Sequence, residues 1–384
     1  MSRGADAAVV GAGIVGAACA AFLARGGVRV TVLEAAAPAA GASGACEGNL
    51  LAWDKHVPGE LALHLRSRAL WERLAAELRL GFEFDPKGSI VVAETPAELD
   101  AVTALARELE AFGVHGEPLD AAGLRAREPH AASDLPGGLL FAGDAQVEPR
   151  LAVEALLADA RAHGAAVRLG AGVRRLRRAG ERVVGVQLHD GEIVPAGTVV
   201  VAAGAWSAPL VRDADRELPL APRKGQIVVT ERAPGLFARK LSEAGYLTAI
   251  ETADEGLQVA MVVESTASGT VLLGSSRELV GFDRGADLAV AGAIVDRAIR
   301  FFPVLGTLRA LRVYAGLRPF TPDHLPAIGG FDGLEGLIVA TGHEGAGVAL
   351  APATGELVAA LVTGAEPAVD ATPFTPDRFA AAAR

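Results

Sequence analysis

The chain has 384 residues, of which 51% are hydrophobic and only 5% aromatic, so its apolar content consists mainly of small aliphatic side chains. This composition excludes an intrinsically disordered protein, and the length is enough for about two domains whose cores need no disulfides or metals. The formal net charge of −10, from 36 basic and 46 acidic residues, argues against nucleic acids and anionic membranes as partners.

Hydrophobic periodicity predicts an α/β protein in which strands and helices alternate at the start and strands dominate the middle of the chain. We expect helices at residues 17–25, 61–80, 97–112, 149–163, 286–302 and 345–362. We expect strands at residues 7–10, 28–34, 166–169, 182–188, 192–194, 198–204, 226–230, 246–250, 258–263 and 270–274. No repeat or low-complexity linker interrupts this order.

Three glycines, Gly11, Gly13 and Gly16, lie where the first predicted strand turns into the first helix. Gly11 permits the tight turn, Gly13 lets the backbone approach a pyrophosphate, and Gly16 lets the helix pack close to the strand. Glu34 ends the second strand, where a carboxylate can accept hydrogen bonds from adenosine ribose hydroxyls. The pattern therefore predicts a bound dinucleotide, without deciding between FAD and NAD.

Residues 7–24 carry no charge, and by length alone they could form a membrane span or, with Arg3 before them, a signal peptide. We expect neither, because the stretch is rich in alanine and glycine and follows Asp6 directly. The two cysteines, Cys19 and Cys46, lack the spacing of a zinc or iron–sulfur site. We therefore expect a cytoplasmic protein with no strong membrane signal and no metal.

Four further segments occur in a fixed order along the chain, at residues 41–45, 199–207, 316–323 and 340–343. In this order, and together with the glycine turn, they resemble the D-amino-acid oxidase family of FAD enzymes, from about residue 5 to 365. The resemblance implies FAD rather than NAD. It also implies a glutathione-reductase-like, FAD-binding Rossmann domain joined to a mixed-sheet α+β substrate domain.

The resemblance further implies that both domains are discontinuous. The expected FAD-binding domain comprises residues 1–80, 145–215 and 310–384, and the expected substrate domain comprises residues 81–144 and 216–309.

The same resemblance assigns the residues that would bind FAD. They are Gly11, Gly13, Ile14, Val15, Gly16, Glu34, Ala42, Ser43, Gly44, Gly48, Asn49, Leu50, Val173, Ala203, Gly204, Trp206, Arg318, Gly342, His343, Glu344, Gly345, Ala346 and Gly347. In sarcosine oxidases a cysteine after the Arg-Pro motif is linked to the flavin, but no cysteine follows Arg318-Pro319 here. We therefore expect non-covalent FAD.

Three residues are candidates for the substrate pocket. Arg318 matches the arginine that binds the substrate carboxylate in glycine oxidase, with an ion pair to Asp323 as the alternative. Tyr246 corresponds to a pocket tyrosine, or else packs in the sheet. His343 is a candidate base, with a backbone anchor as the alternative. Glycine oxidase carries another arginine near the last turn, where this chain has Gly345.

Segments 222–226, 263–267, 274–278 and 343–352 resemble the flavin subunits of D-hydroxyproline, proline, opine and hydrogen-cyanide-forming glycine dehydrogenases. The expected function is oxidation of the C–N bond of a small amino or imino acid by hydride transfer to flavin N5. A partner redox subunit or carrier would then take the electrons. The alternatives are a self-sufficient oxidase that uses O₂ and a non-catalytic flavin-binding subunit.

Overall fold

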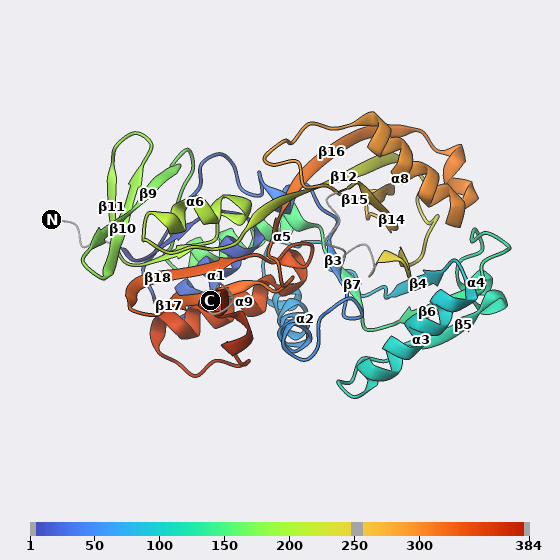
Figure 1. The fold of residues 1–384 in the computed structure, drawn as a ribbon, viewed down its shortest axis with the longest axis horizontal. Coiled ribbons are helices and arrows are strands. Elements are labelled where there is room, and N and C mark those ends of the chain that lie inside the picture. Colours follow the sequence, from blue (N-terminus) through green and yellow to red (C-terminus); the bar gives the residue numbers. More distant parts are fainter. Residues whose placement is uncertain (1–4, 247–255, 380–384) are drawn as a thin grey trace.

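The computed structural model describes residues 5–246 and 256–379. This part of the chain is organised around two large β-sheets (Figure 1). The first sheet has the strand order β17-β18-β10-β11-β1-β2-β8, with β9 paired to β10. Its strands are β1 (Ala5–Val10), β2 (Val30–Leu33), β8 (Ala166–Arg168), β9 (Val173–Ala179), β10 (Arg182–Leu188), β11 (Ile193–Val201), β17 (Ala327–Phe331) and β18 (Leu334–Thr341).

The centre of the first sheet is parallel, because β1 pairs in parallel with both β2 and β11. Its strands are buried and rich in valine, as is typical of a parallel sheet with both faces covered. The helices packed around this half are α1 (Ile14–Arg25), α2 (Gly59–Glu77), α5 (Pro149–Ala162), α6 (Ser207–Arg212) and α9 (Gly347–Thr363).

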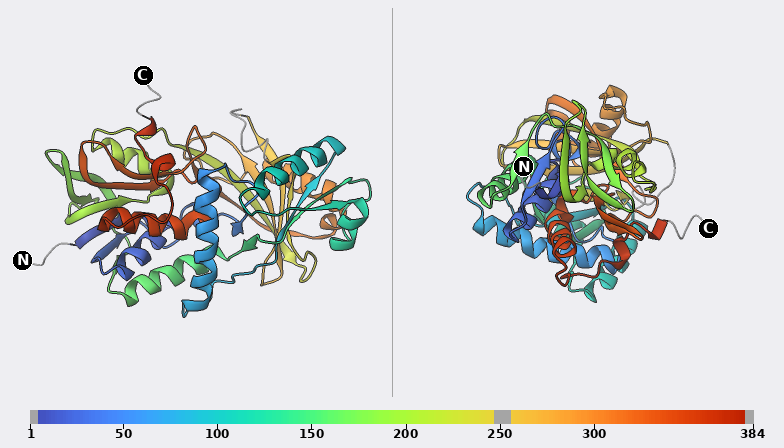
Figure 2. Two further views of the ribbon diagram at one scale, coloured as in Figure 1. Left: turned by 90° about the horizontal axis from the view of Figure 1, so that it is seen from below. Right: turned by 90° about the vertical axis from the view of Figure 1, so that its left-hand side faces the viewer.

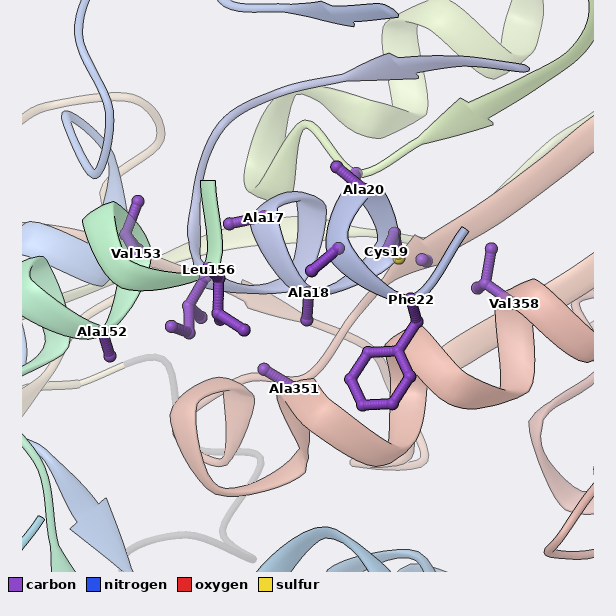
Figure 3. Close-up of a cluster of buried hydrophobic side chains, with 14 of the residues drawn as sticks. Ala17, Ala18, Cys19, Ala20, Phe22, Ala152, Val153, Leu156, Ala351 and Val358 are labelled. Carbon is purple, nitrogen blue, oxygen red and sulfur yellow. The ribbon is translucent and has the colours of Figure 1, made fainter. Parts of the chain in front are cut away.

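Helix α1 lies between α5 and α9, and small side chains allow this close approach (Figure 3). A Cβ on Gly355 of α9 would lie 2.7 Å from the carbonyl of Ala18, so glycine is needed there. Cys19 is fully buried in the same cluster, and burial raises the pKa of its thiol to about 12. This thiol is therefore part of the core and not a reactive group.

The second sheet has the strand order β16-β12-β15-β14-β13-β4-β6-β5 and is mostly antiparallel. Its strands are β4 (Ser89–Ala93), β5 (Glu117–Asp120), β6 (Gly137–Phe141), β12 (Ala221–Arg232), β13 (Lys240–Glu243), β14 (Gln258–Ser265), β15 (Thr270–Arg277) and β16 (Ala310–Phe320). The helices of this half are α3 (Pro96–Glu110), α4 (Ala121–Arg127) and α8 (Leu288–Phe301). Helix α2 and the short pair β3 (Asn49–Leu50) and β7 (Ala145–Gln146) lie between the two halves (Figure 2).

The predicted α/β class is confirmed, and the six predicted helices are present with ends shifted by a few residues. Residues 192–194 and 198–204, predicted as two strands, instead lie largely in the single strand β11. Pro195 lies opposite Gly185, where a Cβ would come within 2.9 Å of Pro195 Cα, so glycine leaves room for the proline in the strand. Tyr246 has a helical backbone, and the rest of the strand predicted at 246–250 lies outside the described residues.

Strand β16 begins at residue 310, within the segment expected to belong to the FAD-binding domain, yet it pairs with β12 in the second sheet. The division into two discontinuous domains stays a prediction. In the described part of the chain, none of the helices combines the length and the apolar character that a membrane span requires.

Candidate active site

A large cleft opens at the carboxyl ends of β1, β2 and β11 and extends to β12 and β16 of the second sheet. Its empty space is about 1910 Å³, open solvent included. In a parallel sheet the carboxyl edge is where ligands bind, since the loops that follow the strands meet there. The cleft therefore joins a nucleotide-binding edge to the sheet expected to hold the substrate.

Where the cleft meets the first sheet, its wall includes glycine residues, whose backbone is not covered by side chains. Gly11 has a φ of 105°, and a Cβ there would lie 2.6 Å from the carbonyl oxygen of Ala202. A Cβ on Gly16 would lie 2.1 Å from the carbonyl oxygen of Gly11. Helix α1 consequently starts directly behind the turn, with no side-chain cap at Gly13, and its amino end faces the cleft.

The carboxylate of Glu34 is held at the end of β2. One oxygen accepts a hydrogen bond from the N–H of Ala12 at 2.8 Å, and the other accepts one from the N–H of Ala36 at 2.9 Å. Ser43 Oγ accepts a hydrogen bond from the N–H of Ile14 at 2.9 Å, which fixes the next loop beside the turn. This cradle of glycines, helix amino end and carboxylate fits the adenosine and pyrophosphate of a dinucleotide.

Most of the predicted cofactor residues line this cleft. They are Gly11, Gly13, Ile14, Val15, Glu34, Ala42, Ser43, Asn49, Val173, Ala203, Gly204, Trp206, Arg318, His343, Glu344, Gly345 and Gly347. The structure does not bring six others to the cleft surface, namely Gly16, Gly44, Gly48, Leu50, Gly342 and Ala346. Gly16, Gly44 and Gly48 lie against backbone carbonyls, and Leu50 is buried in the core.

Arg318 lies on β16 and reaches the cleft across its neighbouring strand, β12. A Cβ on Gly225 would lie 2.1 Å from Arg318 Nη1, so the guanidinium occupies space that only glycine leaves open. Nη1 donates a hydrogen bond to the carbonyl oxygen of Ser276 at 2.8 Å. The ion pair with Asp323 is absent, because Asp323 binds Arg378 at 2.7 Å. Arg318 thus faces the cleft without a counter-ion among the described residues.

Tyr246 and Gly345 border the same part of the cleft as Arg318. The position that a Cβ on Gly345 would occupy is 4.0 Å from both Arg318 Nε and the Tyr246 hydroxyl. A guanidinium and a phenol that converge on one hollow are suited to binding a carboxylate.

His343 is buried, and its Nε2 is 3.0 Å from Thr354 Oγ1. Burial lowers the pKa of His343 to about 3, so the ring is neutral and a weak base at neutral pH. The carboxylate of Glu344 is also bound, because Oε1 lies 2.8 Å from Arg223 Nη1 and Oε2 lies 2.9 Å from His324 Nδ1. Both side chains are suited to fixing the loop before α9.

The two-sheet fold and the glycine-lined cleft are those of a dinucleotide-binding protein. Residues 6–361 match the DAO family, described as FAD dependent oxidoreductase. The chain belongs to this family, as its motifs suggested, and its cofactor is FAD.

Named relatives agree with the family assignment. Glycine oxidase of Pseudomonas aeruginosa is 32% identical over 96% of this chain and 97% of its own length. Hydrogen cyanide synthase subunit HcnC of Pseudomonas protegens is 37% identical over 69% of this chain, and that alignment spans 60% of HcnC. The crystal structure of glycine oxidase from Geobacillus kaustophilus superposes with a TM-score of 0.88 at 28% identity, over 97% of this chain and 98% of that one.

We predict that the purified protein is yellow and that acid or heat releases its flavin as intact FAD. Cys46 lines the cleft, but burial, reinforced by the charge of Glu47, raises the pKa of its thiol and keeps it protonated. Absorbance of the supernatant after acid precipitation, with chromatography against FAD, tests this. Flavin that stays on the denatured chain would contradict it.

Proposed function

We propose that the protein oxidises the C–N bond of a small amino or imino acid and passes the electrons to a partner subunit or carrier. When bound, FAD would supply the two-electron acceptor for the α-hydrogen, which would leave the substrate as hydride. The observation that carries the proposal is Arg318, a partly buried guanidinium with no carboxylate at ion-pair distance among the described residues, which lines the cleft beside Tyr246.

The residues of the pocket act by binding and orientation. Arg318 would bind the substrate carboxylate through its remaining N–H groups, and the Tyr246 hydroxyl would donate a further hydrogen bond. Fixing the carboxylate fixes the direction of the α-hydrogen, which lowers the barrier by positioning. His343 has too low a pKa to take a proton at neutral pH, so the substrate amine would lose its proton to water.

Anaerobic stopped-flow spectroscopy tests the proposal. We expect at least one of D-proline, D-hydroxyproline, L-proline, glycine, sarcosine and the opines to bleach the flavin absorbance. Arg318→Met, which removes the guanidinium, should slow bleaching by that substrate while FAD stays bound. Failure of the whole set, with FAD fully bound, would favour a catalytically silent flavin subunit.

The electron acceptor is tested with the same substrate. We predict that the chain alone reduces an artificial dye much faster than it produces peroxide. Its only two cysteines lack iron–sulfur spacing, so no second redox centre can be assembled from them. One relative, HcnC, is itself named as a subunit. Comparable peroxide formation in air would instead favour the self-sufficient oxidase.

A further inference from the structure

Arg277, the last residue of β15, is a buried cation with no carboxylate at ion-pair distance among the described residues, although its charge helps to lower the pKa of Glu344. Its side chain is almost fully buried, and its Nε and Nη1 make no hydrogen bond to any described residue. Other buried cations are paired, as Lys240 is with Glu264 at 3.0 Å. Leaving a buried guanidinium unpaired costs free energy, because its hydration is lost without replacement. A bound anion would supply the hydrogen-bond acceptors that the buried guanidinium lacks.

The guanidinium of Arg277 lies over the ring of Tyr246, 4.6 Å from the ring centroid. The hydroxyl end of Tyr246 is the end that lies near Gly345 in the cleft. Tyr246 therefore lies between two guanidinium groups: Arg318 is near its hydroxyl in the cleft, and Arg277 lies over the face of its ring. Cation–π contact offsets part of the cost of burial but supplies no acceptor for the N–H groups.

Arg277 lines a second, smaller hollow with about 370 Å³ of empty space, open solvent included. Tyr246, His343, Glu344 and Gly345 line both this hollow and the main cleft. Because residue 345 has no side chain, nothing at that position closes the space between them.

The acidic residues of the small hollow are already bound to other groups. Asp54 pairs with Lys55, and Glu344 lies at ion-pair distance from both Arg223 and His324. Glu60 accepts a hydrogen bond from the N–H of His56, and burial raises the pKa of Glu60 to about 7. Among the described residues, no carboxylate comes within ion-pair distance of Arg277. The hollow can therefore accept an anion from outside.

We propose that Arg277 binds a second carboxylate of the substrate, in the hollow beside Tyr246, while Arg318 binds the first in the cleft. The preferred substrates are then amino or imino acids with two carboxylates, such as an N-carboxyalkyl amino acid. This specificity rests on the proposed function, because it assumes that the substrate's C–N bond lies in the main cleft.

The test compares two ligands that differ only in the second carboxylate. Thiodiacetate and (methylthio)acetate carry sulfur in place of nitrogen, so neither has a C–N bond to oxidise. Isothermal titration of the FAD-loaded protein should show tighter binding of thiodiacetate by roughly 10-fold or more. Arg277→Met should reduce this ratio to about 1, and Arg277→Lys should keep part of it. Arg107→Met, at an exposed position on α3, should leave the ratio unchanged.

Two results would overturn the proposal: a wild-type ratio near 1, or an unchanged ratio in R277M, whether or not R277M binds both ligands more weakly. If R277M does not fold, R277K decides, since an unaltered ratio there also overturns it. Turnover is measured separately with sarcosine and iminodiacetate. If the protein binds thiodiacetate more tightly than (methylthio)acetate as expected but oxidises no amine, the proposed function is contradicted, while the proposal that Arg277 binds a carboxylate is still supported.

Discussion

Replacing Arg318 with lysine is expected to lower kcat/KM roughly 10-fold to 150-fold while FAD stays bound. A lysine ammonium is a point charge and cannot reproduce two parallel hydrogen bonds to a carboxylate. The loss of one charge-assisted hydrogen bond, about 1.5–3 kcal/mol, gives this range. Lysine would also leave the carbonyl of Ser276 without the donor that Arg318 Nη1 provides. Steady-state kinetics with an artificial dye, together with the FAD to protein ratio, measure the effect.

Arg312→Lys provides the matched control for Arg318→Lys. Arg312 lies on the same strand, β16, but its side chain is exposed and contacts the ring of Tyr314. The kcat/KM of the Arg312→Lys protein should stay near the wild-type value. If Arg318→Lys also keeps wild-type kcat/KM, Arg318 does not bind the substrate, and the argument from the cleft fails.

The nucleotide end of the cleft could be predicted from the sequence because its determinants are local. Gly11, Gly13 and Gly16 lie within one strand, turn and helix, and the structure places Gly11 and Gly13 in the turn and Gly16 at the start of α1. Glu34 directly follows β2, the next strand along the chain. A short parallel unit of this kind has one usual connection, so the spacing of residues is enough to place them.

The substrate end could be predicted only in part, because distant segments build it. The sequence singled out Arg318, but the role of Gly225 follows from the register between β12 and β16. Arg277 belongs to a segment noted only for its resemblance, and its missing partners become visible only when burial is known. The local signal at Gly225 is a glycine after two cations, whereas Arg277 follows a glycine and two serines beyond the strand expected at 270–274.

Several strands of the second sheet were also missed. β4 and β6 are short, fully buried runs that contain serine or glycine, so they lack the alternation of a half-exposed strand. β4 pairs in parallel with β13, far along the chain, and such long-range pairing leaves no pattern in either segment.

Replacing Gly16 with alanine is expected to leave the purified chain largely without FAD. The new Cβ would lie 2.1 Å from the carbonyl oxygen of Gly11 and 3.0 Å from its carbon, so the turn or helix α1 must move. Neither can move freely, because β1 is buried between β2 and β11 while α1 is packed between α5 and α9. Overpacking of this kind costs about 1–3 kcal/mol. If that cost falls on the nucleotide turn, FAD binds roughly 5-fold to 150-fold more weakly.

Gly292→Ala is the control for Gly16→Ala, because a Cβ at this position of α8 would have no heavy atom within 4 Å. It should keep full flavin content, and alanine should if anything favour the helix. Titration of FAD into the stripped proteins, followed by quenching of flavin fluorescence, gives the Kd of each. Circular dichroism shows whether the Gly16→Ala chain is folded. A folded Gly16→Ala protein that binds FAD with wild-type Kd would show that α1 can shift, and that its close contact with Gly11 does not hold the nucleotide turn in place.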